Sequence, residues 1–436
     1  MKLSQNYKKI LDSLVTCLAK KIVTSKPLEG LNLYSLVTNI KDVVTVKGSF
    51  LGGDIFAKKN ILVPEIAASM LDLGTRTKDK FQISSTLEMV GARIAFSSGR
   101  YRVHFSARCL KENVGLVIKL LAEQLMGPAY SENDLKTTIK RRNAELKKLK
   151  EDTRTRAILT FLRELYPTNH PNCPPSLNAQ IDAIEKIRAT DLKDFHSNNY
   201  GLGSFNICCV GDVDHSSIEK HLLENFNDWC LSGLKKPKPL TIKSKKLKEK
   251  MEKTVNIPDK SSSDLITGHG IGINREHKDY YSVMMSHFIL GGNFSARLMS
   301  TVRDQEGLTY GIQSTTAGIE EDNDGHWYIW GTFPPDKIDL AKESIENQLK
   351  LWYRKGVTAN ELTAKKATIT GNYQVGLDTT SGLANRIITT VEKGKQLSFM
   401  DQYLDIINEI TLEEVNDAIV RYCDLDNRIT VIAGSI

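Results

Sequence analysis

The chain repeats its own plan once. Segments 181–211 and 404–434 correspond, and four apolar or glycine positions in them recur at one constant offset in the numbering. The four pairs are Ile184 with Ile407, Ile187 with Ile410, Leu192 with Val415, and Gly211 with Gly434. Leu135 also matches Leu362, at a slightly larger offset, within two charged segments that begin at residues 131 and 358. An internal repeat of this kind predicts two copies of one fold.

Each copy places helix and strand patterns in the same order. Apolar residues recur with helical spacing over 114–126 and 340–352, and the segments 102–107 and 327–333 before them have the composition of strands. A chain of 436 residues also exceeds the roughly 250 to 300 residues that one hydrophobic core serves. We therefore expect an α+β fold of two duplicated halves, each a mainly antiparallel sheet with helices on one face.

A lysine-rich run separates the two copies. Residues 235–253 contain nine lysines and two glutamates, so their net charge of +7 equals that of the whole chain. We interpret this run as a solvated linker that joins the halves into a clamshell. The alternative is a tether for nucleic acid, but single-strand binders interleave aromatic residues with their cations, and this run has none. We expect no nucleic-acid partner.

The repeat and the lysine run together predict the domain boundaries. We expect an N-terminal extension over 1–30, an N-terminal domain over 31–232, the linker over 233–253 and a C-terminal domain over 254–436.

The cysteines favour a reducing compartment. They number seven, form no Cys-x-x-Cys, and two of them, Cys208 and Cys209, fall in an apolar run typical of a buried strand. Asp12 interrupts the N-terminal apolar run, which makes a poor secretion signal, although residues 14–17 weakly resemble a lipoprotein cleavage site. No apolar stretch reaches the ~18 residues of a membrane span. We expect a cytoplasmic protein with no membrane span; the periplasm or an organelle is the alternative.

The most specific stretch is LGGNFSARLMSTVRDQEGLTYGIQS, which begins at residue 290. Phe294, Leu298 and Val302 recur every four residues, which predicts a helix from about residue 295 to just before residue 307. Arg303 then lies in the last turn of this helix, and Tyr310 lies at the start of the next strand. The pattern resembles the pitrilysin/insulinase family of inverted-motif zinc peptidases, whose C-terminal domain has a Gly-Gly turn, a helix ending in Arg and a Gly-Leu-x-Tyr strand start.

The resemblance implies a zinc motif in the first half, His-x-x-Glu-His on a helix, with a third ligand, a Glu, on a later helix. Aligned on the residues that follow this motif, Glu65, Ala68 and Ser69 take the positions of the first His, the Glu and the second His. Glu145, at the spacing from Ser69 that the family keeps between motif and third ligand, takes the position of that ligand. These residues supply neither imidazole nor a general base. We therefore expect no metal on this chain.

In the resembling family, the Arg and Tyr of the second half reach the substrate at the metal. The resemblance thus implies that Arg303 and Tyr310 bind substrate, because a guanidinium suits a peptide carbonyl and a phenol can donate to the oxyanion of a tetrahedral intermediate. The structural alternative is that Arg303 satisfies carbonyl groups at the helix end and Tyr310 packs at the strand start.

Two-subunit members of the family divide these parts between chains. By resemblance, we expect a non-catalytic, substrate-binding subunit of a heterodimeric zinc endopeptidase that acts on unfolded peptides. Its homologous partner would carry His-x-x-Glu-His and the zinc, and this chain alone would have no peptidase activity. The alternatives are a structural or assembly subunit of the same fold without a peptidase role, or a self-sufficient peptidase with an unrecognised site.

Overall fold

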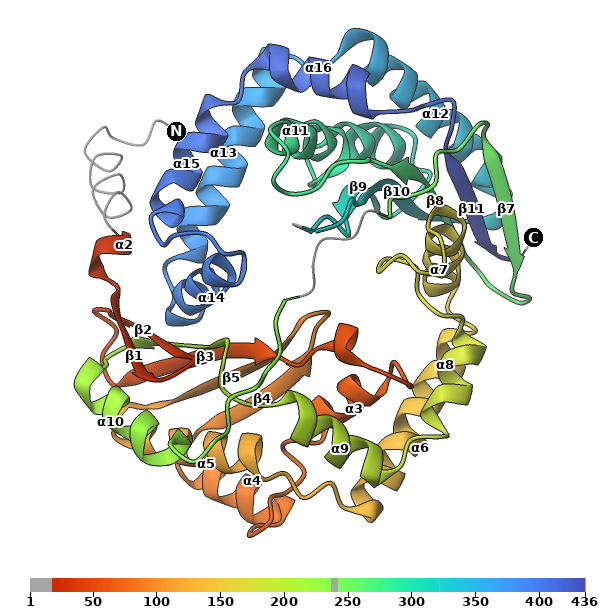
Figure 1. Cartoon of the computed structure of the whole chain (residues 1–436). Coiled ribbons are helices and arrows are strands. Elements are labelled where there is room, and N and C mark those ends of the chain that lie inside the picture. The colour runs from red at the N-terminus through yellow and green to blue at the C-terminus, as the bar shows by residue number, and fades with distance from the viewer. Residues whose placement is uncertain (1–17, 237–241, 321, 436) are drawn as a thin grey trace. The chain divides into compact units, whose positions relative to one another are not determined.

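The structure is a computed structural model that describes residues 18–236, 242–320 and 322–435 (Figure 1). The resemblance to a lipoprotein site at 14–17 and the part of the lysine run at 237–241 lie outside the described residues. The chain forms two compact units. Unit 1 takes the described residues of Met1–Asn143, Ile181–Pro237 and Asn372–Leu404, and unit 2 takes those of Ala144–Gln180, Lys238–Gly371 and Asp405–Ile436.

Unit 1 is built on a six-stranded sheet with the order β1-β2-β6-β3-β5-β4. Strands β2 and β6 run parallel, and the other neighbours run antiparallel, so the sheet is mainly antiparallel as the sequence predicts. Every residue of β6 is buried, in agreement with its apolar sequence. The strands are β1 (Val23–Leu28), β2 (Leu31–Val37), β3 (Val43–Leu51), β4 (Arg93–Ser98), β5 (Arg102–Leu110) and β6 (Phe205–Gly211). Strand β1 lies within the segment 1–30 that we expected to precede the domain.

Helices cover both faces of this sheet. Successive side chains of a strand point to opposite faces. Phe205 of β6 packs against Phe226 of α10 (His215–Phe226), whereas Cys208 and Val210 face the other way and pack in one core with Ile387 of α14 (Thr380–Glu392). Figure 1 shows α14 on one side of the sheet and α5 and α10 on the other.

Unit 2 is built on a five-stranded sheet with the order β7-β11-β8-β10-β9. Strands β7 and β11 run parallel and the remaining neighbours run antiparallel. The strands are β7 (Met251–Asn256), β8 (Ser263–Gly270), β9 (Ile312–Ala317), β10 (His326–Phe333) and β11 (Ile429–Gly434). On one face, Trp327 of β10 packs against His287 of α11 (Tyr280–Gly291) and Trp352 of α12 (Ile338–Lys355).

The opposite face of the second sheet receives α7 (Thr153–Leu165), a helix from the first half of the sequence. Its residues Ala157, Phe161 and Leu165 are fully buried in one core with Ile266 and Val431. Burial of each of the larger of these side chains stabilises the unit by about 1.5–3 kcal/mol.

Helices α7 and α14 are copies of one another. Both have 13 residues, and their first residues, Thr153 and Thr380, stand in the same register of the repeat as Leu135 and Leu362. Each copy of the repeat therefore gives one helix to the sheet formed by the other copy. The sequence repeat predicts the helices but not this exchange.

The remaining elements agree with the predicted order. Helix α5 has the predicted limits, and two long charged helices, α6 and α13, begin at the predicted places. They are α5 (Val114–Met126), α6 (Glu132–Leu149) and α13 (Ala359–Gly376), and the other helices are α2 (Leu18–Lys21), α3 (Val63–Ser69), α4 (Lys80–Met89), α8 (Leu177–Ile184), α9 (Ala189–Asn199), α15 (Phe399–Glu409) and α16 (Leu412–Tyr422).

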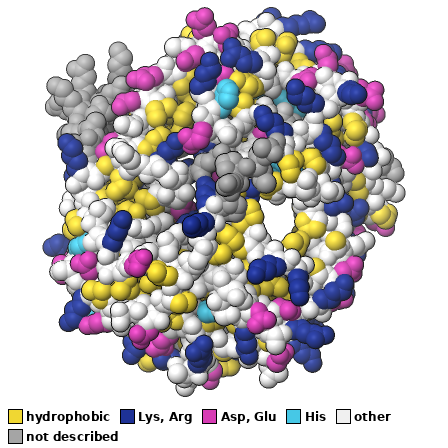
Figure 2. All heavy atoms as spheres, in the orientation of Figure 1, with side chains coloured by type: hydrophobic (Ala, Val, Ile, Leu, Met, Phe, Trp, Pro, Cys, Tyr) yellow, Lys and Arg dark blue, Asp and Glu magenta, His cyan; other side chains and the backbone are white. Residues whose placement is uncertain are grey.

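The described lysines of the run are exposed, but the run is more structured than the linker we predicted. Its last residues form the edge strand β7 of unit 2, and the amide and hydroxyl of Ser244 donate to Asp324. Lys250 and Lys253 form ion pairs with Glu346 and Glu164. An alternating strand pattern is weak in a run this rich in lysine, and β7 forms because its backbone pairs with the neighbouring strand β11. On the face shown in Figure 2, basic and acidic side chains are interspersed.

In the described part of the chain, no helix combines the length and the apolar character that crossing a membrane requires.

Candidate substrate-binding site

The segment 290–314, which carries the family resemblance, starts at the end of α11. Closely packed neighbours leave room only for glycine at positions 291 and 292. A Cβ on Gly291 would lie 2.5 Å from the amide nitrogen of Ser314 in β9, and one on Gly292 would lie 2.1 Å from the ring of Phe288. Both distances are impossible for a real side chain. The two glycines therefore allow the chain to turn closely against the edge of the second sheet.

The predicted helix is present. Its hydrogen bonds each span one residue more than those of an α-helix. Residues Met299–Gln305 form a π-helical segment, a geometry that is rare and occurs often at functional sites. It ends at Gln305, and Gly307 follows with a φ of +62°, a left-handed conformation that suits glycine just after a helix. Leu298 and Val302 are fully buried, as their spacing predicts.

Phe294 departs from the predicted buried face, because its side chain is 76% exposed. It precedes the helix and lies in the turn between the two glycines and the first helical residue. Periodicity alone cannot separate a helical position from a turn position that has the same spacing.

Arg303 lies in the last turn, as predicted. Its Nη1 donates to Oδ1 of Asp304 at 3.2 Å, and its guanidinium carbon lies 5.5 Å from the centre of the Phe294 ring. Cation–π attraction acts at that distance. The contacts given for this guanidinium are thus with a carboxylate and an aromatic ring.

Tyr310 lies two residues before β9 and is 98% exposed. A tyrosine with a purely structural role normally buries its ring and gives its hydroxyl a partner. The backbone that carries Tyr310 is fixed, because the hydroxyl of the neighbouring Thr309 donates to the carbonyl of Thr332 on β10. The phenol is thus presented to solvent by a rigid support.

The positions of the predicted zinc motif lie on α3 in unit 1, and they do not form a metal site. Ala68 is fully buried and has no donor atom, and the hydroxyl of Ser69 donates to the carbonyl of Ile66 at 3.0 Å. Nη2 of Arg142, from α6, lies 3.0 Å from Oε1 of Glu65. No group of His, Cys, Asp and Glu side chains that could hold a metal is present among the residues the structure describes.

Glu145 is exposed on α6, one turn after Arg142. Sequence reasoning placed a carboxylate at this position but did not foresee that Arg142 pairs with Glu65 of α3. The donor set at these positions does not fit zinc, because a guanidinium occupies the carboxylate of Glu65 and the general base is replaced by a methyl group.

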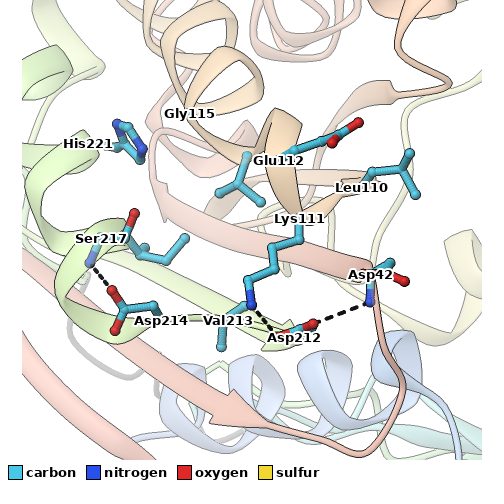
Figure 3. A pocket seen from close by; sticks show the side chains of 12 residues that line it. Asp42, Leu110, Lys111, Glu112, Gly115, Asp212, Val213, Asp214, Ser217 and His221 are labelled. Carbon is cyan, nitrogen blue, oxygen red and sulfur yellow. Dashed lines mark hydrogen bonds and ion pairs between the residues drawn. The ribbon is translucent and has the colours of Figure 1, made fainter.

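The structure also contains a pocket in unit 1 that the sequence did not indicate (Figure 3). It has a volume of about 730 Å³ and lies beside α10 and the start of α5. Several of its polar groups are engaged with one another. Nζ of Lys111 lies 2.6 Å from Oδ1 of Asp212, and Asp214 accepts the amide of Ser217 and caps α10.

Comparisons with known proteins agree with the family resemblance. Residues 65–171 match the insulinase family, peptidase family M16, and residues 186–369 match the peptidase M16 inactive domain. The chain belongs to peptidase family M16. The M16 resemblance that the sequence suggested is thereby confirmed.

Two bacterial M16 relatives cover most of the chain. It is 24% identical to the "Uncharacterized zinc protease YmxG" of Bacillus subtilis, over 79% of this chain and 81% of the relative. It is 25% identical to the "Non-peptidase homolog YmxG" of Helicobacter pylori, over 87% of this chain and 86% of the relative.

Two solved structures share the fold of this chain. The crystal structure of a peptidase M16 inactive domain from Pseudomonas fluorescens has a TM-score of 0.83 and 22% identity, and the match covers 95% of this chain and 98% of that one. A protease from Helicobacter pylori has a TM-score of 0.82 and 16% identity, and the match covers 95% of this chain and 99% of that one.

Proposed function

We propose that this chain is the non-catalytic, substrate-binding subunit of a heterodimeric M16 zinc endopeptidase that acts on unfolded peptides. It supplies Arg303 and Tyr310 to the zinc site of a homologous partner that carries His-x-x-Glu-His. The match to an inactive M16 domain and the lack of a fitting donor set at Glu65, Ala68 and Ser69 support the first part of the proposal.

The observation that carries the second part is the exposure of Tyr310. A phenol that is 98% exposed on a rigid strand start contributes almost no packing energy to its own chain. It is available to donate a hydrogen bond to a peptide carbonyl oxygen that becomes negative in the transition state. Arg303, permanently charged and able to donate several hydrogen bonds, suits the carbonyl groups or acidic side chains of the same peptide.

The partner supplies the metal in this proposal. Zinc there would polarise the scissile carbonyl and activate a water molecule. This chain's part is to bind and orient the peptide, and to stabilise the negative charge with the Tyr310 hydroxyl.

The experiment is to purify this chain together with a homologue that bears His-x-x-Glu-His, and to measure zinc content and peptide hydrolysis for each chain and for the mixture. We expect zinc only in the partner and hydrolysis only in the mixture. The Tyr310→Phe variant should lower the rate of the mixture by about 10²- to 10³-fold, as loss of an oxyanion donor does.

Arg108, an exposed arginine on β5 in unit 1, offers a matched control for Arg303. Arg108→Ala should leave the rate unchanged, whereas Arg303→Ala should lower it. Stoichiometric zinc together with hydrolysis in this chain alone would contradict the proposal. If Arg303→Ala and Tyr310→Phe both leave the mixture at full rate, the chain has a structural role instead.

A further inference from the structure

The turn that carries the exposed ring of Phe294 is held by a buried lysine. Lys365 of α13 is only 3% exposed. Its Nζ lies 2.7 Å from Oδ1 of Asn293 and 2.8 Å from Oγ of Ser295, the two residues on either side of Phe294. Two short hydrogen bonds from one ammonium group thus clamp the turn on both sides of the aromatic residue.

A second contact from the same helix fixes the next residues. Glu361, one turn before Lys365, forms a two-point ion pair with Arg297 at 2.5 Å and 2.7 Å. Burial acts to raise the pKa of Glu361, but the hydrogen bonds from Arg297 and Thr358 lower it to about 2. Residues 293–297 are therefore held to α13 by two charged side chains.

Burying the ammonium of Lys365 has a cost, because a charged group loses its hydration in the interior. Burial accordingly lowers the pKa of Lys365. Single exposed apolar side chains are common and need no explanation. The turn at Phe294 is different, because the side chains on both sides of the ring are hydrogen-bonded to a buried ammonium group.

The ring is also oriented. The guanidinium of Arg303 lies 5.5 Å from its centre, within the range of a cation–π contact. With the arginine on the ring and the backbone clamped on both sides, Phe294 offers an apolar surface directly beside the guanidinium. An extended peptide could place an apolar side chain on this surface while its backbone carbonyl accepts from Arg303.

We infer that Phe294 contacts the substrate and selects peptides that carry an aromatic or large aliphatic side chain, and that Lys365 is the positioning residue that holds Phe294 there. Unfolded peptides are the substrates that expose such side chains. This inference rests on the proposed function and adds a substrate preference to it.

The test uses the mixture of this chain and its zinc-bearing partner, with two fluorogenic peptides that differ only by Phe or Ser at one position. That position is moved along the peptide until the largest difference in KM is found. The unaltered mixture should show a lower KM for the Phe peptide. Phe294→Ala should reduce this preference by about threefold to tenfold, the range typical of an aromatic contact, and should leave kcat nearly unchanged.

Phe81 provides the control for Phe294. It is 73% exposed on α4 of unit 1, so Phe81→Ala removes an equally exposed ring and should leave the preference unchanged. Lys365→Met should reduce the preference as Phe294→Ala does. Because the two residues act through one contact, the double variant should lose no more than either single variant. Thermal unfolding of each variant identifies any that fail to fold.

The possible failures can be told apart. A preference that is absent in the unaltered mixture, or unchanged in a folded Phe294→Ala variant, overturns this inference, and the proposed function stands if Tyr310→Phe still slows hydrolysis. If Tyr310→Phe and Arg303→Ala also have no effect, the proposed function itself fails. Additive effects of Phe294→Ala and Lys365→Met would remove Lys365 from the positioning role.

Discussion

Arg142 forms an ion pair with Glu65, and its Nη2 lies 3.0 Å from Oε1 of the carboxylate. By resemblance to M16 peptidases, Glu65 occupies the position of the first zinc ligand. A guanidinium next to that position adds a fixed positive charge where the active members of the family would hold Zn²⁺. Loss of the ligands and gain of this cation both disfavour zinc binding.

We predict that the zinc site can be restored. Glu65→His, Ala68→Glu and Ser69→His together recreate His-x-x-Glu-His on α3, and the family resemblance assigns the third ligand to Glu145. Zinc affinity should increase further when Arg142→Ala removes the neighbouring cation, because like charges repel. The measurement is zinc content per chain after dialysis. The control is Glu65→His alone, which should retain no zinc. A folded fourfold variant without zinc would show that the alignment of the motif is shifted.

A second prediction separates stability from function at Tyr310. Because its side chain is 98% exposed, Tyr310→Ala should change the free energy of unfolding by no more than about 0.5 kcal/mol, as surface substitutions usually do. In the mixture with the partner, the same variant should be strongly impaired. Urea unfolding and hydrolysis rates are compared on one preparation. A large loss of stability would instead indicate that the tyrosine packs within its own unit.

A third prediction concerns pH. Unit 2 contains His269, His287 and His326, which are all buried, and burial lowers the pKa of all three. For His326 the pKa falls from 6.5 to about 4. Between these values the unfolded chain binds a proton that the folded chain does not, so stability is lost as the pH falls from 6.5 toward 4.

The expected loss is up to about 1.4 kcal/mol per pH unit for each such histidine. Three of the four tryptophans, Trp327, Trp330 and Trp352, lie in unit 2, so tryptophan fluorescence during urea unfolding mainly reports this unit. The midpoint should be lower at pH 5 than at pH 7.5. In His326→Phe the difference between the two pH values should shrink. An undiminished difference would mean that other groups cause the pH dependence.

A fourth prediction uses the thiols. Burial raises the pKa of Cys109 to about 11 and that of Cys208 well above its usual value, and a buried thiol is not a thiolate at pH 8. Cys230 is exposed. Iodoacetamide should therefore label Cys230 quickly and the Cys208-Cys209 peptide only after unfolding, as peptide mass spectrometry can measure. Rapid labelling of Cys208 in the native protein would be inconsistent with the buried β6 strand.

The local structure could largely be predicted from the sequence. The limits of α5, the buried strand β6 and the helix that carries Arg303 follow from patterns among near neighbours in the chain. That Ala68 offers no donor atom also follows from the sequence alone. The lysine run was interpreted less well, because the edge strand β7 and the contacts of Ser244 depend on partners far away in the sequence.

What the sequence determined by itself is the repeat, the types of most elements and the identity of the residues at the candidate site. The tertiary structure decided how they are used. It placed α7 and α14 each on the sheet of the other copy. An apolar helix face packs against whichever sheet lies within its reach, and the periodicity of the sequence does not indicate which sheet that is. It also decided that Tyr310 and Phe294 face solvent, since exposure depends on which distant groups, such as Lys365 and Thr332, hold the backbone beside them.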